Sequence, residues 1–324
     1  MNYINYVKES PLMGMTGLWG GISTPLIGGA AGNLWYGSRG LNAGAYPAKE
    51  NIDYWNIDST GNASTFGVLT ASGRGEIGGC SNAVRGLFWG GSTSNIIDYV
   101  TIASTGNATD FGDMTYSPYY PGAMASEEDR GVAGGGITPA SAADIDYVTI
   151  STTGNASDFG DLQVGRYSPG TASNGVRGVF ACGGPTPTYT NNSASYITFA
   201  NAGSQTATYF GDMTLNTYGH LGCSSDATND RGVFAGSSST PTNNTIDYIT
   251  IGSTGNATDF GDLTVGGRGP AGTSNGSRGC YAGGHPGSRQ LVIDYVTIMS
   301  AGNATDFGDL TETMHGSGGC SGDP

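Results

Sequence analysis

The chain has 324 residues, of which 58 are glycine, and its formal net charge at pH 7 is −14. A charge of this sign repels phosphate backbones and anionic lipid, so we do not expect nucleic acid as a partner. The 18 tyrosines and 10 phenylalanines argue against a disordered low-complexity chain and favour a packed β protein with many tight turns.

The first 38 residues stand outside the repeats that follow. They contain no basic region leading into an apolar run, so no signal peptide is expected. Residues 10–38 are uncharged, but Gly, Pro, Ser and Thr interrupt them too often for a membrane-spanning helix. We therefore expect residues 1–38 to be an N-terminal arm or cap, and we expect no membrane insertion.

From residue 39 onward three blocks recur six times in a fixed order, and a looser block of small residues such as IGGCSN precedes each next copy. The first block starts with Arg-Gly and runs into apolar residues, the second reads IDYVTI, and the third reads STGNATDFGDL. The first begins at Arg39, Arg85, Arg130, Arg177, Arg231 and Arg278; the second centres on Tyr54, Tyr99, Tyr147, Tyr196, Tyr248 and Tyr295; the third carries Phe66, Phe111, Phe159, Phe210, Phe260 and Phe307.

Successive arginines of the first block are 46, 45, 47, 54 and 47 residues apart, which is the size of a four-stranded propeller blade. Each block alternates apolar and polar residues over a strand-length window and is bounded by turn residues. The sequence thus predicts an all-β fold, a single six-bladed β-propeller over residues 39–324 with four antiparallel strands per blade. We expect the C-terminal block, Gly316 to Gly322, to complete the first blade and close the ring. Gly28 to Trp35 is the alternative closing strand.

The repeat resembles the Kelch family over about residues 39–322. The glycine doublets Gly90-Gly91, Gly183-Gly184 and Gly283-Gly284 match the Kelch pattern, as do the IDY tyrosines and the FGD phenylalanines, although Kelch repeats usually have Trp at the last position. The fourth copy is degenerate, with Ser195 for the usual Asp, Gly236-Ser237 for the doublet and a two-residue insertion before Phe210.

The wording IDYVTI-STGNATDFGDLT is also similar to repeats in virion proteins of tailed bacteriophages, especially aquatic and cyanobacterial ones. This resemblance implies a virion component that is made in the host cytoplasm. Its expected partners are other virion proteins and a host surface glycan.

The repeated charged residues have a structural interpretation and a functional one. The structural one is Arg–carboxylate pairing and turn capping, which each blade needs alike; the functional one is a ring of metal or sugar sites. We favour the structural one, since a catalytic site is normally made once from unlike residues. The aspartates concerned are Asp53, Asp98, Asp146, Asp247 and Asp294.

If strands A to D are counted from the small-residue block, the A–B and C–D connections share one face, the constant face, and the B–C and D–A connections share the other, the variable face. The loops of the variable face differ sharply between blades, as expected of a binding surface on a rigid scaffold. Tyrosine, arginine and histidine there suit glycan or protein contact, although loop tyrosines could instead pack on neighbouring blades. The candidate ligand-binding residues are Tyr116, Tyr119, Tyr120, Arg166, Tyr167, Tyr218, His220, Arg268, His285, Arg289 and His315.

No catalytic motif, metal motif or cofactor motif stands in the sequence, so we predict no catalytic residue, no metal and no cofactor. The leading hypothesis is a tail- or surface-associated virion protein that binds a host glycan or a neighbouring virion protein. One alternative is a purely structural capsid or tail decoration protein. A second alternative is a carbohydrate-active enzyme on a propeller scaffold.

Overall fold

The computed structural model describes residues 37–47, 49–125, 129–201, 203, 205–219, 221–224, 230–238 and 243–324, with 125 and 221–224 described for the backbone alone. The alternative closing strand Gly28–Trp35 and almost all of the predicted arm lie outside this part of the chain, so the domain boundary at residue 38 stays a prediction. Among the described residues, no helix has the length and apolar character needed to cross a membrane.

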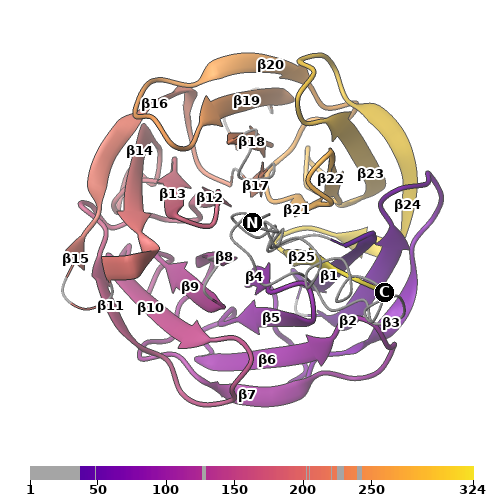
Figure 1. The fold of residues 1–324 in the computed structure, drawn as a ribbon. Helices are drawn as coiled ribbons and strands as arrows, with labels where there is room; N and C mark the ends of the chain where they lie inside the picture. The colour runs from indigo at the N-terminus through magenta and orange to yellow at the C-terminus, as the bar shows by residue number, and fades with distance from the viewer. Residues whose placement is uncertain are drawn as a thin grey trace, which may run out of the picture. The chain divides into compact units, whose positions relative to one another are not determined.

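The strands form six separate sheets arranged in a ring, one sheet per blade (Figure 1). From the axis outward, the first blade contains β25 (Gly318–Gly322), β1 (Arg39–Ala45), β2 (Lys49–Asn56) and β3 (Ser64–Val68), and the second contains β4 (Gly78–Ser81), β5 (Arg85–Trp89), β6 (Ile96–Thr101) and β7 (Thr109–Asp113). The third contains β8 (Gly122–Ala125), β9 (Arg130–Gly134), β10 (Asp144–Thr149) and β11 (Ser157–Asp161), and the fourth contains β12 (Gly170–Ser173), β13 (Arg177–Ala181), β14 (Asn191–Thr198) and β16 (Thr208–Thr217). The fifth contains β17 (Leu221–Ser224), β18 (Arg231–Ala235), β19 (Thr245–Thr250) and β20 (Thr258–Asp262), and the sixth contains β21 (Ala271–Ser274), β22 (Arg278–Ala282), β23 (Gln290–Thr297) and β24 (Thr305–Met314).

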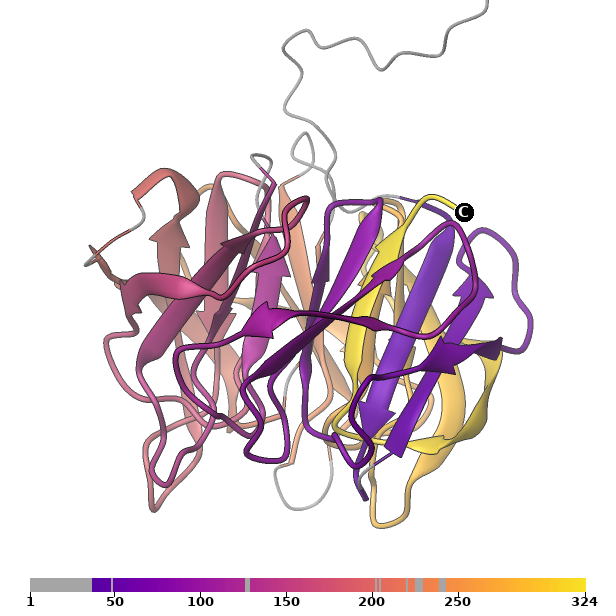
Figure 2. The same cartoon turned by 90° about the horizontal axis from the view of Figure 1, so that it is seen from below.

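The ring closes through the C-terminal strand, as predicted. β25 pairs antiparallel with β1, with Arg39 opposite Gly322 and Ala43 opposite Gly318, so the last strand of the chain is the innermost strand of the first blade. Figure 2 shows the strands running between two faces, with the C-terminus at one of them. A closed ring leaves each sheet with a neighbouring blade on both faces, and its edges are the short inner strand at the axis and the outer strand.

One feature assigned to the fourth blade from the sequence belongs to another blade, and the insertion in the fourth blade forms secondary structure. Gly236 and Ser237 follow β18, so the missing glycine doublet belongs to the fifth blade and not to the fourth. The insertion before Phe210 forms a short 3-10 helix, η1 (Phe199–Asn201), and β15 (Gln205–Thr206), which pairs in parallel with β11 of the third blade.

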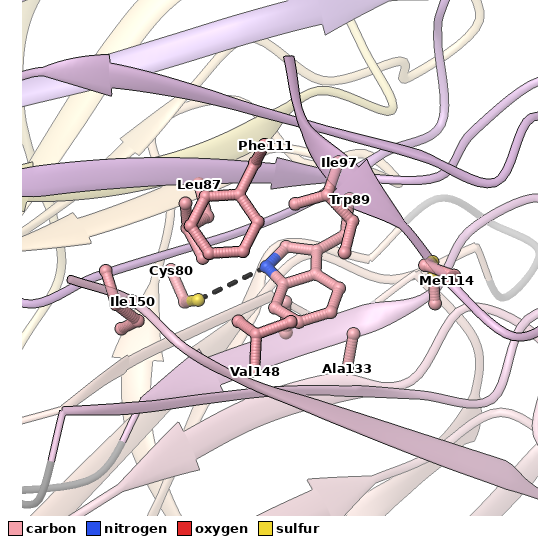
Figure 3. Close-up of a cluster of buried hydrophobic side chains, with 10 residues drawn as sticks. Cys80, Leu87, Trp89, Ile97, Phe111, Met114, Ala133, Val148 and Ile150 are labelled. Carbon is pink, nitrogen blue, oxygen red and sulfur yellow. Dashed lines mark hydrogen bonds between the residues drawn. The ribbon is translucent and has the colours of Figure 1, made fainter. Parts of the chain in front are cut away.

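The hydrophobic core lies between neighbouring blades. In one cluster Trp89 and Phe111 of the second blade pack with Val148 and Ile150 of the third, and Trp89 Nε1 donates to Cys80 Sγ at 3.3 Å (Figure 3). Because a blade packs against a neighbour on each side, its strands B and C are buried on both faces. The described cysteine side chains are buried; they are those of Cys80, Cys182, Cys280 and Cys320.

The outer strand of each blade is covered by the C–D turn of the next one. The amides of Gly106 and Ala108 donate to the carbonyls of Phe66 and Val68 at 3.0 and 2.8 Å. This approach is so close that a Cβ on Gly67 would lie 2.1 Å from the Gly106 oxygen. The FGD glycine is thus required for inter-blade contact. The other blades repeat this contact at Gly112, Gly160, Gly211, Gly261 and Gly308.

Candidate functional site

The six repeated arginines stack on the repeated tyrosines. Arg85 lies 4.8 Å from the ring centre of Tyr99, and its Nη1 donates to the carbonyls of Ile150 and Ser151 in the next blade. The sequence predicted Arg–carboxylate pairing here; the contacts found instead place each arginine over an aromatic ring and let it donate to a backbone carbonyl of the next blade. The same stacking occurs at Arg39, Arg130, Arg177, Arg231 and Arg278.

The repeated IDY aspartates are buried and bridge neighbouring blades. Asp98 is 0 % exposed and accepts from the hydroxyl of Thr70 at 2.5 Å and from the Thr70 amide at 3.1 Å. Burial raises the pKa of Asp53, Asp146, Asp247 and Asp294 above its usual value, against the hydrogen bonds that lower it. The equivalent pairs are Thr115–Asp146, Thr214–Asp247, Thr264–Asp294 and Thr311–Asp53.

The Asn-Ala-Ser/Thr asparagines are also used between blades. Asn155 Oδ1 accepts from the amide of Asp113, in the outer strand of the preceding blade, at 3.1 Å. Asn62, Asn256 and Asn303 make the same contact with Asp309, Asp212 and Asp262. The repeated polar residues therefore hold the ring together.

Arg166 lies inside the fourth blade and not on the variable face. It is 1 % exposed and donates to the carbonyl of Cys182 at 2.8 Å and to Ser195 Oγ at 2.8 Å. Sequence reasoning missed its counterpart Arg74, which lies at the same distance before the inner strand of the second blade and pairs with Asp98 at 2.7 Å. The available signal was that both arginines lie four residues before the first residue of an inner strand, Gly78 for Arg74 and Gly170 for Arg166. Because Ser195 replaces the aspartate, Arg166 has no such carboxylate, and burial lowers its pKa to about 10.

The D–A loops of all six blades meet around the axis on the variable face. The residue two positions before each inner strand has positive φ, between 50° and 77°. Amides of these residues donate to the carbonyl of the equivalent residue in the preceding blade: Tyr120 to Glu76 at 2.8 Å and Gly316 to Gly269 at 2.9 Å, for example. Five such bonds connect the ring of D–A loops that carries the candidate side chains. The six positions are Glu76, Tyr120, Ser168, Gly219, Gly269 and Gly316.

Tyrosines form one half of a cluster above this ring, which we call the axial cluster. The ring centre of Tyr167 lies 5.1 Å from Tyr120, 5.1 Å from Tyr189 and 5.0 Å from Tyr218. Burial raises the pKa of Tyr167 to about 12. Glu76 is 8 % exposed and hydrogen-bonded to Tyr120, and burial raises its pKa. Sequence reasoning missed Tyr189 and Glu76, although they lie in a B–C loop and a D–A loop of the same variable face, which was the available signal.

Basic and histidine side chains form the other half of the axial cluster. The ring centre of His315 lies 4.8 Å from that of His285 and 5.5 Å from that of Tyr46. Arg289 lies 6.0 Å from the ring centre of Tyr46, and Arg268 Nη1 is 3.5 Å from the hydroxyl of Tyr218. Burial, followed by the nearby His285 and arginines, lowers the pKa of His315 to about 4, so His315 is neutral at pH 7.

The structure brings together seven of the eleven predicted residues: Tyr120, Tyr167, Tyr218, Arg268, His285, Arg289 and His315. Tyr116 instead packs between blades, where its hydroxyl donates to the carbonyls of Gly135 and Asp144 at 3.0 and 3.1 Å. Tyr119 pairs through its backbone with Ile137. His220 lies outside the described residues.

The cavities near the axis are small, whereas those of about 240 and 360 Å³ lie away from it, beside Tyr99 and beside Lys49. One of about 10 Å³ lies among Tyr120, Tyr218, Arg268 and His315. Another of about 50 Å³ lies on the axis among the inner strands, whose backbones are so close that a Cβ on Gly79 would lie 2.5 Å from the Gly319 oxygen. A ligand larger than a water-sized group would therefore contact the axial cluster from outside. Within the described residues no cluster of His, Cys, Asp or Glu is placed to hold a metal ion.

Comparison of the sequence with protein-family models gives no match, and a search of curated proteins gives no relative. The fold of this chain is an all-β, six-bladed propeller.

Proposed function

We propose that this protein is a non-catalytic binding module that contacts its ligand through the variable face. The observation that supports this is the axial cluster, in which unlike side chains from several blades meet on one face. The repeated arginine, aspartate and asparagine side chains, by contrast, make contacts within the fold, mostly between blades. A unique group of aromatic and basic residues on a rigid repeated frame is what recognition requires.

The sequence of the repeats supports a Kelch-like propeller and a tail- or surface-associated virion component of a tailed bacteriophage, made in the host cytoplasm. In that setting the ligand is a host surface glycan, and a neighbouring virion protein is the alternative. Tyrosines suit a glycan because each offers an apolar ring face and a polar hydroxyl. Tyr46 is 49 % exposed and supplies such a surface next to His315.

A carbohydrate-active enzyme would require two carboxylates on this face. The described interactions of Glu76 are with Tyr120 and Arg268 and not with a second carboxylate. A decoration protein would instead dock through residues 1–38, and it would have no need of the axial cluster.

The test compares two tyrosines that are equally exposed. Tyr46 lies in the axial cluster, whereas Tyr209 lies on the outer strand β16 and is 48 % exposed. We expect the intact chain to bind in a glycan array and to whole host cells, Tyr46→Ala to weaken that binding, and Tyr209→Ala to leave it unchanged. Thermal unfolding of both variants controls for folding. Absence of binding by the intact chain, or equal binding by both variants, would favour the decoration protein.

A further inference from the structure

Most basic side chains of this protein are used inside the fold. Among the described residues, the six repeated arginines lie over tyrosine rings, Arg74 and Arg166 are buried, and Lys49 pairs with Glu312. The other two arginines in the described part of the chain are Arg268, whose Nη1 donates to the Tyr218 hydroxyl at 3.5 Å, and Arg289, which lies 6.0 Å from the ring centre of Tyr46. Both lie in the axial cluster, within electrostatic range of His315.

Three nitrogen atoms of this group are buried and have no hydrogen-bond partner among the described residues. They are Nε of Arg268, Nε of Arg289 and Nδ1 of His315. His315 as a residue is 3 % exposed, and together with Arg268 it borders the cavity of about 10 Å³. Buried polar groups are almost always hydrogen-bonded, so an unpaired group of this kind points to a ligand atom.

We propose that Arg268, Arg289 and His315 form a binding site for the carboxylate of an acidic sugar. This proposal rests on the proposed function, and it specifies which glycan the variable face recognises. The guanidinium group presents N–H donors in a fork that matches the two oxygens of a carboxylate.

Size and surroundings favour a carboxylate attached to a sugar ring. The cavity holds about one water-sized group, such as one carboxylate oxygen, and leaves the rest of the ligand outside, where Tyr46 presents an exposed ring next to His315. An aromatic ring packs on the apolar C–H face of a pyranose, which a flexible acidic side chain lacks. Glu76 is hydrogen-bonded to Tyr120 and interacts electrostatically with Arg268, whereas His285, Arg268 and Arg289 act on His315.

The net charge of −14 makes the protein select against ligands that carry many negative charges. A polyanion with closely spaced charges is repelled by the rest of the surface, whereas one carboxylate on an otherwise neutral glycan meets the basic pair at little cost. The site therefore fits a glycan with isolated acidic residues.

The experiment titrates the full chain by calorimetry with glucuronic acid and N-acetylneuraminic acid. Glucose, acetate and poly-glutamate serve as the neutral, small-anion and acidic-peptide probes. We expect the acidic sugars to bind, and Arg268→Gln and Arg289→Gln each to weaken that binding about tenfold or more. Lys49→Gln removes the same charge from a residue that the fold uses, and we expect less than about a twofold change.

Each other outcome overturns the proposal in a distinct way. If glucose binds as well as the acidic sugars, the variable face binds glycans without a carboxylate site, and the proposed function stands. If acetate binds as tightly as glucuronic acid, the site holds a small anion only. If poly-glutamate binds in an arginine-dependent manner and no sugar does, the ligand is an acidic protein segment. If Arg268→Gln and Arg289→Gln bind acidic sugars like the unaltered chain, the site lies elsewhere.

Discussion

Thr70 and Asp98 belong to neighbouring blades, and Thr70 donates both its hydroxyl and its amide to the buried carboxylate of Asp98, at 2.5 and 3.1 Å. The same contact recurs at four other joints, including Thr311–Asp53, which links the sixth blade to the first. Ring closure therefore depends on the pairing of β25 with β1 and also on this repeated Thr–Asp contact, which we call the latch.

Loss of one latch hydroxyl should destabilise the whole ring. Thr264→Val keeps the shape of the side chain but leaves the buried Asp294 carboxylate with one bond fewer, and we expect the free energy of unfolding to fall by about 1–3 kcal/mol. Urea unfolding followed by tyrosine fluorescence measures this. Thr297→Val is the matched control, since Thr297 is exposed on β23 and its substitution should cost less than about 0.5 kcal/mol. Equal effects of the two variants would show that the latch contributes nothing.

The glycine of each FGD block should be far less replaceable than the glycine of the turn that covers it. A Cβ on Gly261 would lie 2.4 Å from the Gly302 oxygen, whereas a Cβ on Gly255 would meet nothing within 4 Å. We expect Gly261→Ala to lower the free energy of unfolding by about 3 kcal/mol or more, because two backbones must separate. Gly255→Ala should change it by less than about 1 kcal/mol. Equal unfolding midpoints in urea would contradict the close approach.

The number of blades, the strand order and the closing strand could be predicted because each block repeats at nearly constant spacing and carries its own turn residues. Partners across blades could not be predicted in the same way. The carbonyl that Arg39 contacts belongs to Ile102, 63 residues away, and its position depends on the twist of the ring. The axial cluster was found in part: its loops share no motif, so nothing in the sequence says which of their side chains meet, and Tyr189 and Glu76 were missed.

The joint between the third and fourth blades should gain stability from a restored carboxylate. Ser195 lies where the other blades have aspartate, and Arg166 donates to its hydroxyl at 2.8 Å. Ser195→Asp would place a carboxylate beside Arg166, as Asp98 lies beside Arg74. We expect the free energy of unfolding to rise by about 1–3 kcal/mol, because a buried cation gains a counter-charge.

Two variants separate charge from shape at this joint. Ser195→Asn has the size of aspartate without its charge, and we expect no gain in urea unfolding. Gln163→Thr added to Ser195→Asp would supply the latch threonine that this joint lacks, and the double variant should exceed the sum of its single changes. If Ser195→Asn stabilises as much as Ser195→Asp, the effect is one of packing and the charge of Arg166 plays no part.

The stability of the protein should fall on mild acidification in a way that His315 controls. The pKa of His315 is about 4 in the folded chain and about 6.5 when unfolded, so below pH 6.5 the unfolded chain binds a proton that the folded chain does not. The stabilisation is complete above pH 6.5 and is lost as pH falls toward 4, by up to about 3 kcal/mol. The buried aspartates, whose pKa values are raised, act in the opposite direction, because the folded chain holds their protons more tightly.

The comparison with His315→Gln isolates the histidine, because the aspartates titrate alike in both chains and cancel in the difference. We expect the free energy of unfolding of the unaltered chain to fall faster than that of the variant between pH 7 and pH 4.5, in urea series at fixed ionic strength. His315 faces Arg268, Arg289 and His285, so protonation adds a positive charge to a basic group, and the steeper slope follows from that placement. Parallel curves would mean that His315 is solvated well enough to titrate as in the unfolded chain.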